Sequence, residues 1–133
     1  DIVKAGEIAK THMDAGADFL TGSSQQSVGA IKVTAGKKGV YWLSTDADQI
    51  SFAPDTVLAS QVYKWDKVIA RILDLRKQGI IGGQHLTLSF QQNLLELRYN
   101  PRLVDKIPPD VMDIVKKAEK DIIEGKLIVD AAK

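Results

Sequence analysis

The first 50 residues alternate between helix and strand patterns, and glycines mark the short connections between them. Small and apolar residues recur at helical spacing over residues 2–15, and Gly16 follows where a left-handed cap would end a helix. Residues 17–21 predict a short buried strand, residues 25–37 a second helix, and residues 40–43 a second strand. Helix, strand, helix and strand with tight connections predict an α/β fold with a parallel sheet and right-handed crossovers.

Polar side chains follow both predicted strands, over residues 21–25 and residues 44–49. Because ligands of parallel sheets bind beyond the carboxyl ends of the strands, the two clusters together predict a binding site at this edge. Ser23 and Ser24 are also suited to cap the second helix. The inward stripe of that helix would consist of Val28, Ile31 and Ala35.

After Pro54 the pattern predicts a third strand over residues 56–62 and an amphipathic helix that starts near Trp65 and ends at Gly79. A terminal helix is expected over residues 110–124, because two prolines precede it and a glycine follows it.

Three further segments favour strands. Residues 84–90 alternate between apolar and polar side chains, as in a half-buried strand, and residues 94–99 should pair with them. Residues 127–129 would add a last edge strand.

The composition excludes several classes of function. With 18 Lys and Arg against 17 Asp and Glu, the net charge of +1 provides no overall field that would attract nucleic acid or an acidic membrane. The chain has no Cys, and His12 and His85 lack further ligands at metal spacing, so neither a thiolate nucleophile nor a metal or other cofactor is expected. The apolar runs are shorter than the ~20 residues of a membrane span.

Several phrases occur in one order along nearly the whole chain. They are Gly16-Ala17-Asp18-Phe19-Leu20, Thr21-Gly22-Ser23-Ser24-Gln25, Lys38-Gly39-Val40, Asp46-Ala47-Asp48-Gln49, Ala53-Pro54-Asp55-Thr56-Val57-Leu58-Ala59-Ser60, Asn100-Pro101 and Gly125-Lys126-Leu127-Ile128-Val129. In this order they resemble the C-terminal half of the basic membrane protein family, the nucleoside-binding lipoproteins of ABC importers.

The resemblance implies a periplasmic-binding-protein type I fold with flavodoxin-like lobes, of which only the C-terminal half is present. Residues 1–55 would form β/α units of the carboxyl lobe, and residues 56–108 a hinge crossing with an amino-lobe helix and strands. Residues 109–133 would return to the carboxyl lobe as the terminal helix and strand. The chain starts at Asp1 without a leader, and we expect it to be a processed or truncated piece.

The resemblance also implies the ligand contacts. Asp46 lies where the family's aspartate binds the ribose hydroxyls, and a carboxylate can accept two hydrogen bonds from a vicinal diol. Asp48 is a second candidate, although either carboxylate could instead cap a turn. The family's small loop, in which bare backbone lets a ligand approach closely, corresponds to Gly22, Ser23, Ser24 and Gln25. This chain lacks the Gly-Gly-Thr-Gly sequence of many members.

Two more candidates follow the crossing strand. Many family members have a lysine there, and this chain has Tyr63 followed by Lys64, which resembles the branches with an aromatic residue at this place. A tyrosine can stack on a ligand or hydrogen-bond to it, but an aromatic residue near a helix start also suits core packing.

The expected function is non-catalytic capture of a nucleoside or purine base outside the cytoplasm, by a lipid-anchored protein that delivers it to an ABC permease. The piece alone should bind weakly and is expected to self-associate over the surface that the missing lobe would cover.

Two alternatives remain open. A ligand-free sensor or interaction module of the same fold would fit the altered loop. A Mg²⁺-dependent phosphatase would use Asp46 and Asp48 as an Asp-x-Asp pair, but that family prefers Thr or Val where Ile50 lies.

Overall fold

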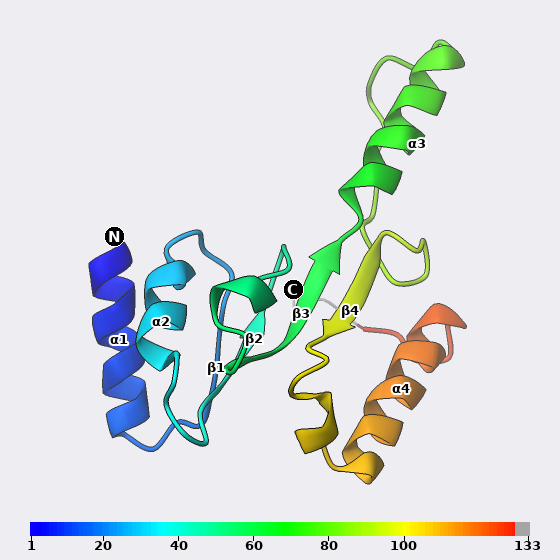
Figure 1. The fold of residues 1–133 in the computed structure, drawn as a ribbon. Coiled ribbons are helices and arrows are strands. Elements are labelled where there is room, and N and C mark those ends of the chain that lie inside the picture. The colour runs from blue at the N-terminus through cyan, green and yellow to red at the C-terminus, as the bar shows by residue number, and fades with distance from the viewer. Residues whose placement is uncertain (130–133) are drawn as a thin grey trace. The chain divides into compact units, whose positions relative to one another are not determined.

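A computed structural model describes residues 1–129 of the 133-residue chain. The regular elements are α1 (Ile2–Asp14), β1 (Phe19–Gly22), α2 (Ser27–Thr34), β2 (Tyr41–Ser44), η1 (Ile50–Phe52), β3 (Val57–Tyr63), α3 (Trp65–Lys77), β4 (Leu95–Tyr99), η2 (Val104–Lys106) and α4 (Pro109–Ile123), where η marks a short 3-10 helix (Figure 1). The predicted α/β class is therefore confirmed.

The chain forms two compact units. The first comprises Asp1–Val62 and Leu97–Ile107, and the second comprises Tyr63–Glu96 and the chain from Pro108 onward. The lobe boundaries expected from the resemblance stay a prediction.

The four strands form one sheet in the order β1-β2-β3-β4. β1 pairs with β2 in parallel, and β2 pairs with β3 in parallel, as the helix and strand alternation predicts. β4 runs antiparallel to β3, because Asn100 N donates to Leu58 O whereas Lys64 N donates to Leu94 O. The sheet is thus parallel except for its last strand.

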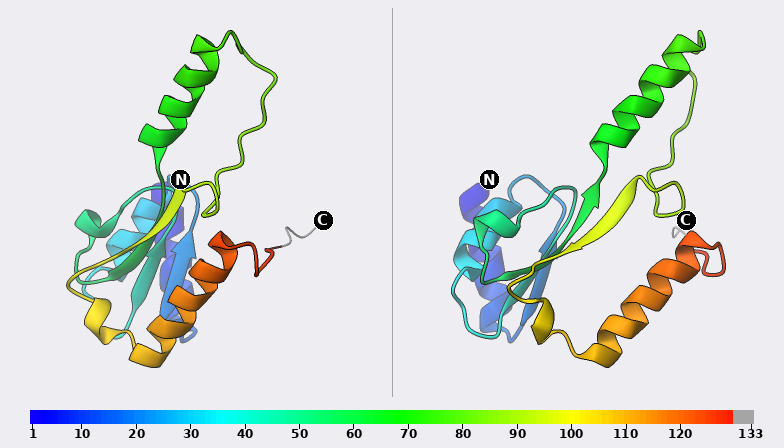
Figure 2. Two further views of the ribbon diagram at one scale, coloured as in Figure 1. Left: turned by 90° about the vertical axis from the view of Figure 1, so that its right-hand side faces the viewer. Right: turned by 45° about the vertical axis from the view of Figure 1, so that its right-hand side comes forward.

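Helices α1 and α2 lie side by side on one face of β1 and β2 (Figures 1 and 2). Leu20 and Trp42 point into this face and are buried, whereas Phe19 and Leu43, their neighbours in the strands, are exposed. This alternation follows from the period of two along a strand. The buried cluster between helices and sheet consists of Ala9, Leu20, Ala30, Ile31, Trp42, Ala53 and Val57.

Two glycines let α1 and α2 approach closely. A Cβ atom added at Gly29 would lie 2.0 Å from the carbonyl oxygen of Ile2, and one added at Gly6 would lie 3.3 Å from the carbonyl oxygen of Gly29. The backbone of one helix therefore occupies the space that a side chain on the other would need.

We predict that Gly29→Ala destabilises the chain by about 1–3 kcal/mol or more, as overpacking in a core does. Gly82→Ala is the matched control, because a Cβ atom there meets nothing within 4 Å. Urea unfolding of the two variants measures the difference. Equal midpoints would show that α1 can move away from α2 without cost.

Three helices end at the glycines that the sequence marks. After α1, Gly16 N donates to Met13 O and Ala17 N donates to His12 O, and the φ of Gly16 is +94°. The same pair of hydrogen bonds follows α3 at Gly79 and α4 at Gly125, both again with positive φ. These are Schellman motifs, which glycine favours because it has no Cβ to clash at positive φ.

Helix α2 is shorter than predicted. It ends at Thr34, and Ala35, expected on its inward stripe, is exposed. Gly36 follows with a φ of +75°, and its N–H donates to Thr56 Oγ1 of the segment before β3. The chain therefore leaves the helix early to reach this partner. Ser23 and Ser24 do not cap α2, since its N-cap residue is Gln26 without a side-chain hydrogen bond.

The strand predictions for residues 84–90 and 127–129 are wrong. Residues 84–90 keep their burial alternation only in part and form no strand, and the strand that they were expected to pair with, β4, pairs with β3 instead. Residues 94–99 do contain a strand, but its partner is β3. Residues 127–129 continue from the cap of α4, and Leu127 N donates back to Asp121 O.

The Asn100 side chain ties the end of β4 to the start of β3. It is fully buried, and its Nδ2 donates to Pro54 O at 2.7 Å and to Val57 O at 2.6 Å. Its Oδ1 accepts from Arg102 N. Because a buried amide without partners is costly, these bonds make the position of β4 specific.

The helices of the second unit expose apolar side chains. Val68 is the buried residue of α3, and α4 has none within the described chain, while Ile69 and Ile114 are 55% and 67% exposed.

On α4, a hydrogen bond from Lys117 lowers the pKa of the Asp121 carboxyl group.

Candidate functional site

The two polar clusters predicted at the strand ends lie next to each other. In the parallel register of β1 and β2, Gly22 pairs with Ser44, the last residues of the two strands. Thr45 Oγ1, directly after β2, donates to Gly22 O at 2.9 Å, and Thr21 Oγ1 donates to Leu43 O at 2.8 Å. One hydroxyl group thus donates from β1 to β2, and the other donates from the residue after β2 back to β1, so the two strand ends are joined by two side-chain hydrogen bonds.

The loop after β1 presents exposed polar side chains. Ser23, Ser24 and Gln25 are exposed, and no side-chain hydrogen bond engages them within the described chain. Gly22 lies over the buried Trp42, whose ring would be 3.4 Å from a Cβ atom at this position. A contact of this length is an ordinary van der Waals distance, so the glycine leaves the backbone bare at this point without being required by the packing.

Asp46 has an unusual backbone conformation. Its φ is +72°, and Ala47 N donates to Thr45 O at 2.9 Å across it. A hydrogen bond of this span with positive φ at the central residue is the rarer and more strained γ-turn. Strain of this kind costs on the order of 1–3 kcal/mol and persists only where the surroundings hold it.

The Asp46 carboxylate is exposed, and no hydrogen bond or ion pair engages it within residues 1–129. It does not cap a turn or helix there, which was the structural alternative. The carboxylate is therefore open to a hydrogen-bond donor from outside the chain.

Asp48, two residues later, is already engaged. Its Oδ1 accepts from Ile50 N at 3.0 Å, and its Oδ2 accepts from Arg98 Nη1 of β4 at 3.1 Å. The first contact caps the η1 turn, as the alternative for this residue expected. The structure therefore separates the two aspartates into one open carboxylate and one that holds the loop.

A buried polar cluster supports this loop from β2 and β3. Ser44 and Ser60 are paired in register and are 3% and 0% exposed. Ser60 Oγ accepts from Gln49 N at 3.4 Å. Within the described chain, the buried atoms Ser44 Oγ and Gln49 Oε1 have no hydrogen-bond partner.

Tyr63 and Lys64 belong to the second unit. The ring of Tyr63 lies 5.7 Å from the ring of Trp65 in a tilted arrangement. Lys64 Nζ donates to Asn93 Oδ1 at 2.7 Å and lies 3.1 Å from Glu96 Oε2, so local acceptors already compensate its charge.

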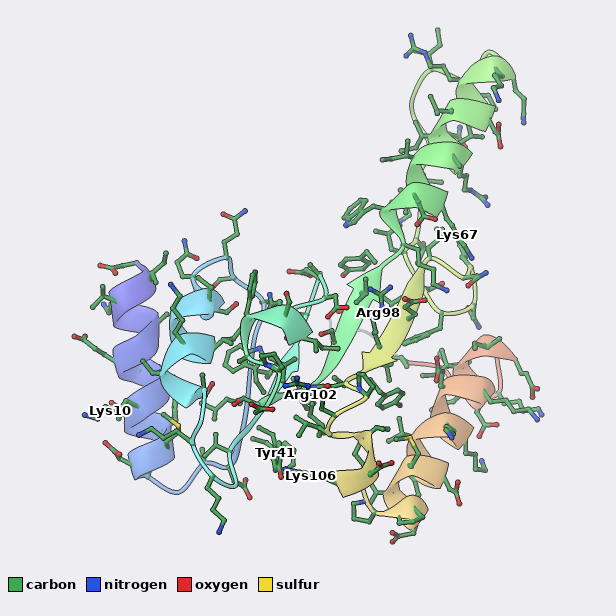
Figure 3. The ribbon with its side chains drawn as sticks, in the orientation of Figure 1. Lys10, Tyr41, Lys67, Arg98, Arg102 and Lys106 are labelled. Atoms are coloured by element: carbon green, nitrogen blue, oxygen red, sulfur yellow. The ribbon has the colours of Figure 1, made fainter. Side chains whose placement is uncertain are left out.

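Several residues around the site were not predicted as part of it. Arg98 lies 50 positions after Asp48, and no local pattern links them. Ser60 has a weak signal, since a serine inside an apolar strand must find a polar partner. Figure 3 shows Arg98 on β4, with Arg102 and Lys106 farther along the chain. Arg102 forms an ion pair with Asp55, and Lys106 lies over the ring of Tyr41.

The site contains no cluster suited to a metal ion: across residues 1–129, no three or more His, Asp or Glu side chains come close enough to hold one. No helix in that part of the chain is long and apolar enough to span a bilayer.

Sequence comparison places the chain in a defined group. The family model Bmp, described as "ABC transporter substrate-binding protein PnrA-like", matches residues 1–132. A search of curated protein sequences finds no match.

Three solved structures share the fold. A solute-binding protein of an ABC transporter system from Aeropyrum pernix K1 superposes with a TM-score of 0.84 at 15% identity, over 100% of this chain and 45% of that one. One from Conexibacter woesei has a TM-score of 0.72 at 17% identity, over 98% and 43%. A transcriptional activator of the comK gene from Bacillus halodurans has a TM-score of 0.79 at 18% identity, over 98% and 45%. The chain spans less than half the length of each.

We predict that Thr45→Val destabilises the chain by about 1 kcal/mol, because the isosteric change removes the hydroxyl that donates to Gly22 O. Thr87→Val, an exposed position outside the regular elements, serves as the control. Thermal or urea unfolding compares the two. Equal losses from both variants would mean that the cross-strand bond adds nothing specific.

Proposed function

Because the chain belongs to the PnrA-like family of ABC transporter substrate-binding proteins, we propose that it forms the C-terminal half of a protein that captures a nucleoside or purine base. In this proposal the intact protein works outside the cytoplasm, is lipid-anchored, and delivers its ligand to an ABC permease. The family assignment supports a role in substrate binding, and the nucleoside rests on the resemblance.

The observation that carries the proposal is the open carboxylate of Asp46 at the carboxyl edge of the parallel sheet. A ribose presents two neighbouring hydroxyl donors, and an ionised carboxylate is a strong acceptor for both. The strained turn supports the same role, since strain concentrates at functional sites. Asp48 acts beside it as a support, because its oxygens already accept from Ile50 N and Arg98.

The loop of Gly22, Ser23, Ser24 and Gln25 would contact the base or sugar next to Asp46. Its supports are the missing side chain at Gly22 and the exposed hydroxyl and amide groups that follow. By resemblance, Tyr63 and Lys64 are further proposed contacts. Lys64 would have to exchange its bonds to Asn93 and Glu96 for the ligand.

We propose that the intact protein has two lobes and that the absent chain covers apolar surface of the second unit. Trp65, Ile69 and Ile114 are each more than half exposed in the chain described here, and an apolar surface of this kind needs a cover. In the piece alone, a second copy would provide the cover by self-association.

A sensor without transport activity is the second candidate. The similarity to the Bacillus halodurans activator supports it, because that protein shares the fold and is described as a regulator of transcription. The departure of the 22–25 loop from the family's glycine-rich sequence also fits. For a phosphatase the second aspartate would have to act as acid or base, and the contacts of Asp48 give that no support.

Calorimetric titration of the intact two-lobed protein with adenosine, guanosine, inosine and the free bases tests the proposal. We predict that Asp46→Asn weakens nucleoside binding about 10-fold to 100-fold, because hydrogen bonds to charged groups contribute roughly 1.5–3 kcal/mol. Binding of a free base should change little, since it lacks the ribose hydroxyls.

Asp18→Asn is the matched control, an exposed aspartate before β1 and so at the opposite edge of the sheet. It should leave every affinity unchanged. If none of the ligands gives a heat of binding, the result would contradict the transport proposal and favour the sensor. Equal weakening for nucleosides and free bases would contradict the role of Asp46 at the ribose.

A further inference from the structure

The strained turn at Asp46 needs contacts that hold it. With a φ of +72°, Asp46 adopts a conformation that non-glycine residues rarely occupy. Within residues 1–129, the hydrogen bond from Ala47 N to Thr45 O is the only one inside the turn. The carboxylate of Asp46 takes no part in holding it.

Contacts on both sides of the turn supply the restraint. Before it, Thr45 Oγ1 donates to Gly22 O. After it, the Asp48 carboxylate accepts from Ile50 N and from Arg98 Nη1, and Gln49 N donates to Ser60 Oγ. The turn is therefore anchored to Gly22 of β1, Ser60 of β3 and Arg98 of β4, and these three residues belong to the first unit.

Of these anchors, Arg98 comes from farthest along the chain and is itself well placed. It lies in β4, two residues before Asn100, whose buried amide bonds to Pro54 O and Val57 O. The backbone that carries Arg98 is therefore held tightly. A guanidinium group forms directed hydrogen bonds to a carboxylate, which restrains Asp48 more than a freely rotating ammonium would.

We propose that Arg98 is a positioning residue for the ligand site: through Asp48 it holds the γ-turn that keeps the Asp46 carboxylate open at the sheet edge. The inference rests on the proposed function for what binds there, but the effect on the turn is independent of any ligand. Arg98 acts through Asp48 and does not itself contact the ligand.

The ion pair is not primarily a source of global stability. Its side chains are 48% and 32% exposed, and ion pairs of such exposure add little to the stability of a fold. Its effect should therefore appear in the conformation of the loop, with a small effect on unfolding. This distinguishes a positioning residue from a merely structural one.

The experiment compares Arg98→Met, Arg98→Lys and Asp48→Asn in the intact protein. Arg102→Met is the matched control, because Arg102 pairs with the exposed Asp55 and does not contact the 45–49 loop. NMR supplies a readout without ligand. Positive φ shortens the distance between the amide and Hα protons of residue 46 and so strengthens the NOE between them, and amide exchange of Ala47 reports its bond to Thr45 O.

We expect Arg98→Met to weaken that NOE and to accelerate Ala47 exchange about threefold to fivefold, as loss of an exposed ion pair would. Nucleoside affinity should fall by a similar factor, and free-base affinity should not change. Arg98→Lys should restore part of each effect. In the Asp46→Asn background, Arg98→Met should have no further effect on affinity. The control Arg102→Met should leave affinity unchanged both in the wild-type protein and in the Asp46→Asn background.

An unchanged NOE and unchanged Ala47 exchange in both Arg98→Met and Asp48→Asn would overturn the inference. A changed turn with unchanged nucleoside affinity would also overturn the inference, because the turn would then not position the Asp46 carboxylate for binding. If the wild-type protein binds no nucleoside, the proposed function fails, while the NMR readout still decides whether Arg98 holds the turn. Arg98→Lys and Asp48→Asn keep the test valid if Arg98→Met does not fold.

Discussion

The parallel ladder between β1 and β2 is the contact on which the rest of the first unit depends. It places Gly22 beside Ser44 and thereby brings together two loops whose bonded residues are 23 positions apart. Such a ladder needs a crossover helix, and α2 fits against the sheet with α1 because Gly6 and Gly29 allow the two helices to approach closely. Core packing and the position of the candidate site thus share one cause.

Surroundings give two chemically identical groups different roles. Asp46 and Asp48 are both exposed acids of one short loop, yet Asp48 is held by Ile50 N and Arg98, whereas the Asp46 carboxylate has no such contact within residues 1–129. The backbone differs at the two residues, since Asp46 is the centre of a γ-turn with positive φ, whereas the Asp48 carboxylate caps the turn that follows it. The position of the Asp46 carboxylate, the proposed ligand contact, therefore depends on its neighbours.

Prediction from the sequence succeeded where the signal is local. The helices that end at Gly16, Gly79 and Gly125 were expected, because a glycine at positive φ leaves a clear mark after an apolar stripe. The prediction failed for residues 84–90. Their alternation is also local, but a strand needs backbone hydrogen bonds to a neighbouring strand, and residues 95–99, the expected partner, pair with β3 instead.

In the candidate site, too, the residues with a local sequence signal could be predicted and those held by long-range contacts could not. The amino-acid order is sufficient to place Asp46 and the 22–25 loop after two strands, because alternation and strand ends are properties of neighbouring residues. The order cannot indicate that Arg98 reaches Asp48 from 50 positions away, or that Ser60 supports Gln49. The Ser60 contact exists only once β3 has paired with β2, and the Arg98 contact only once β4 has paired with β3 and the Asn100 amide has joined their ends. Residues so far apart in the sequence interact through the packed chain alone.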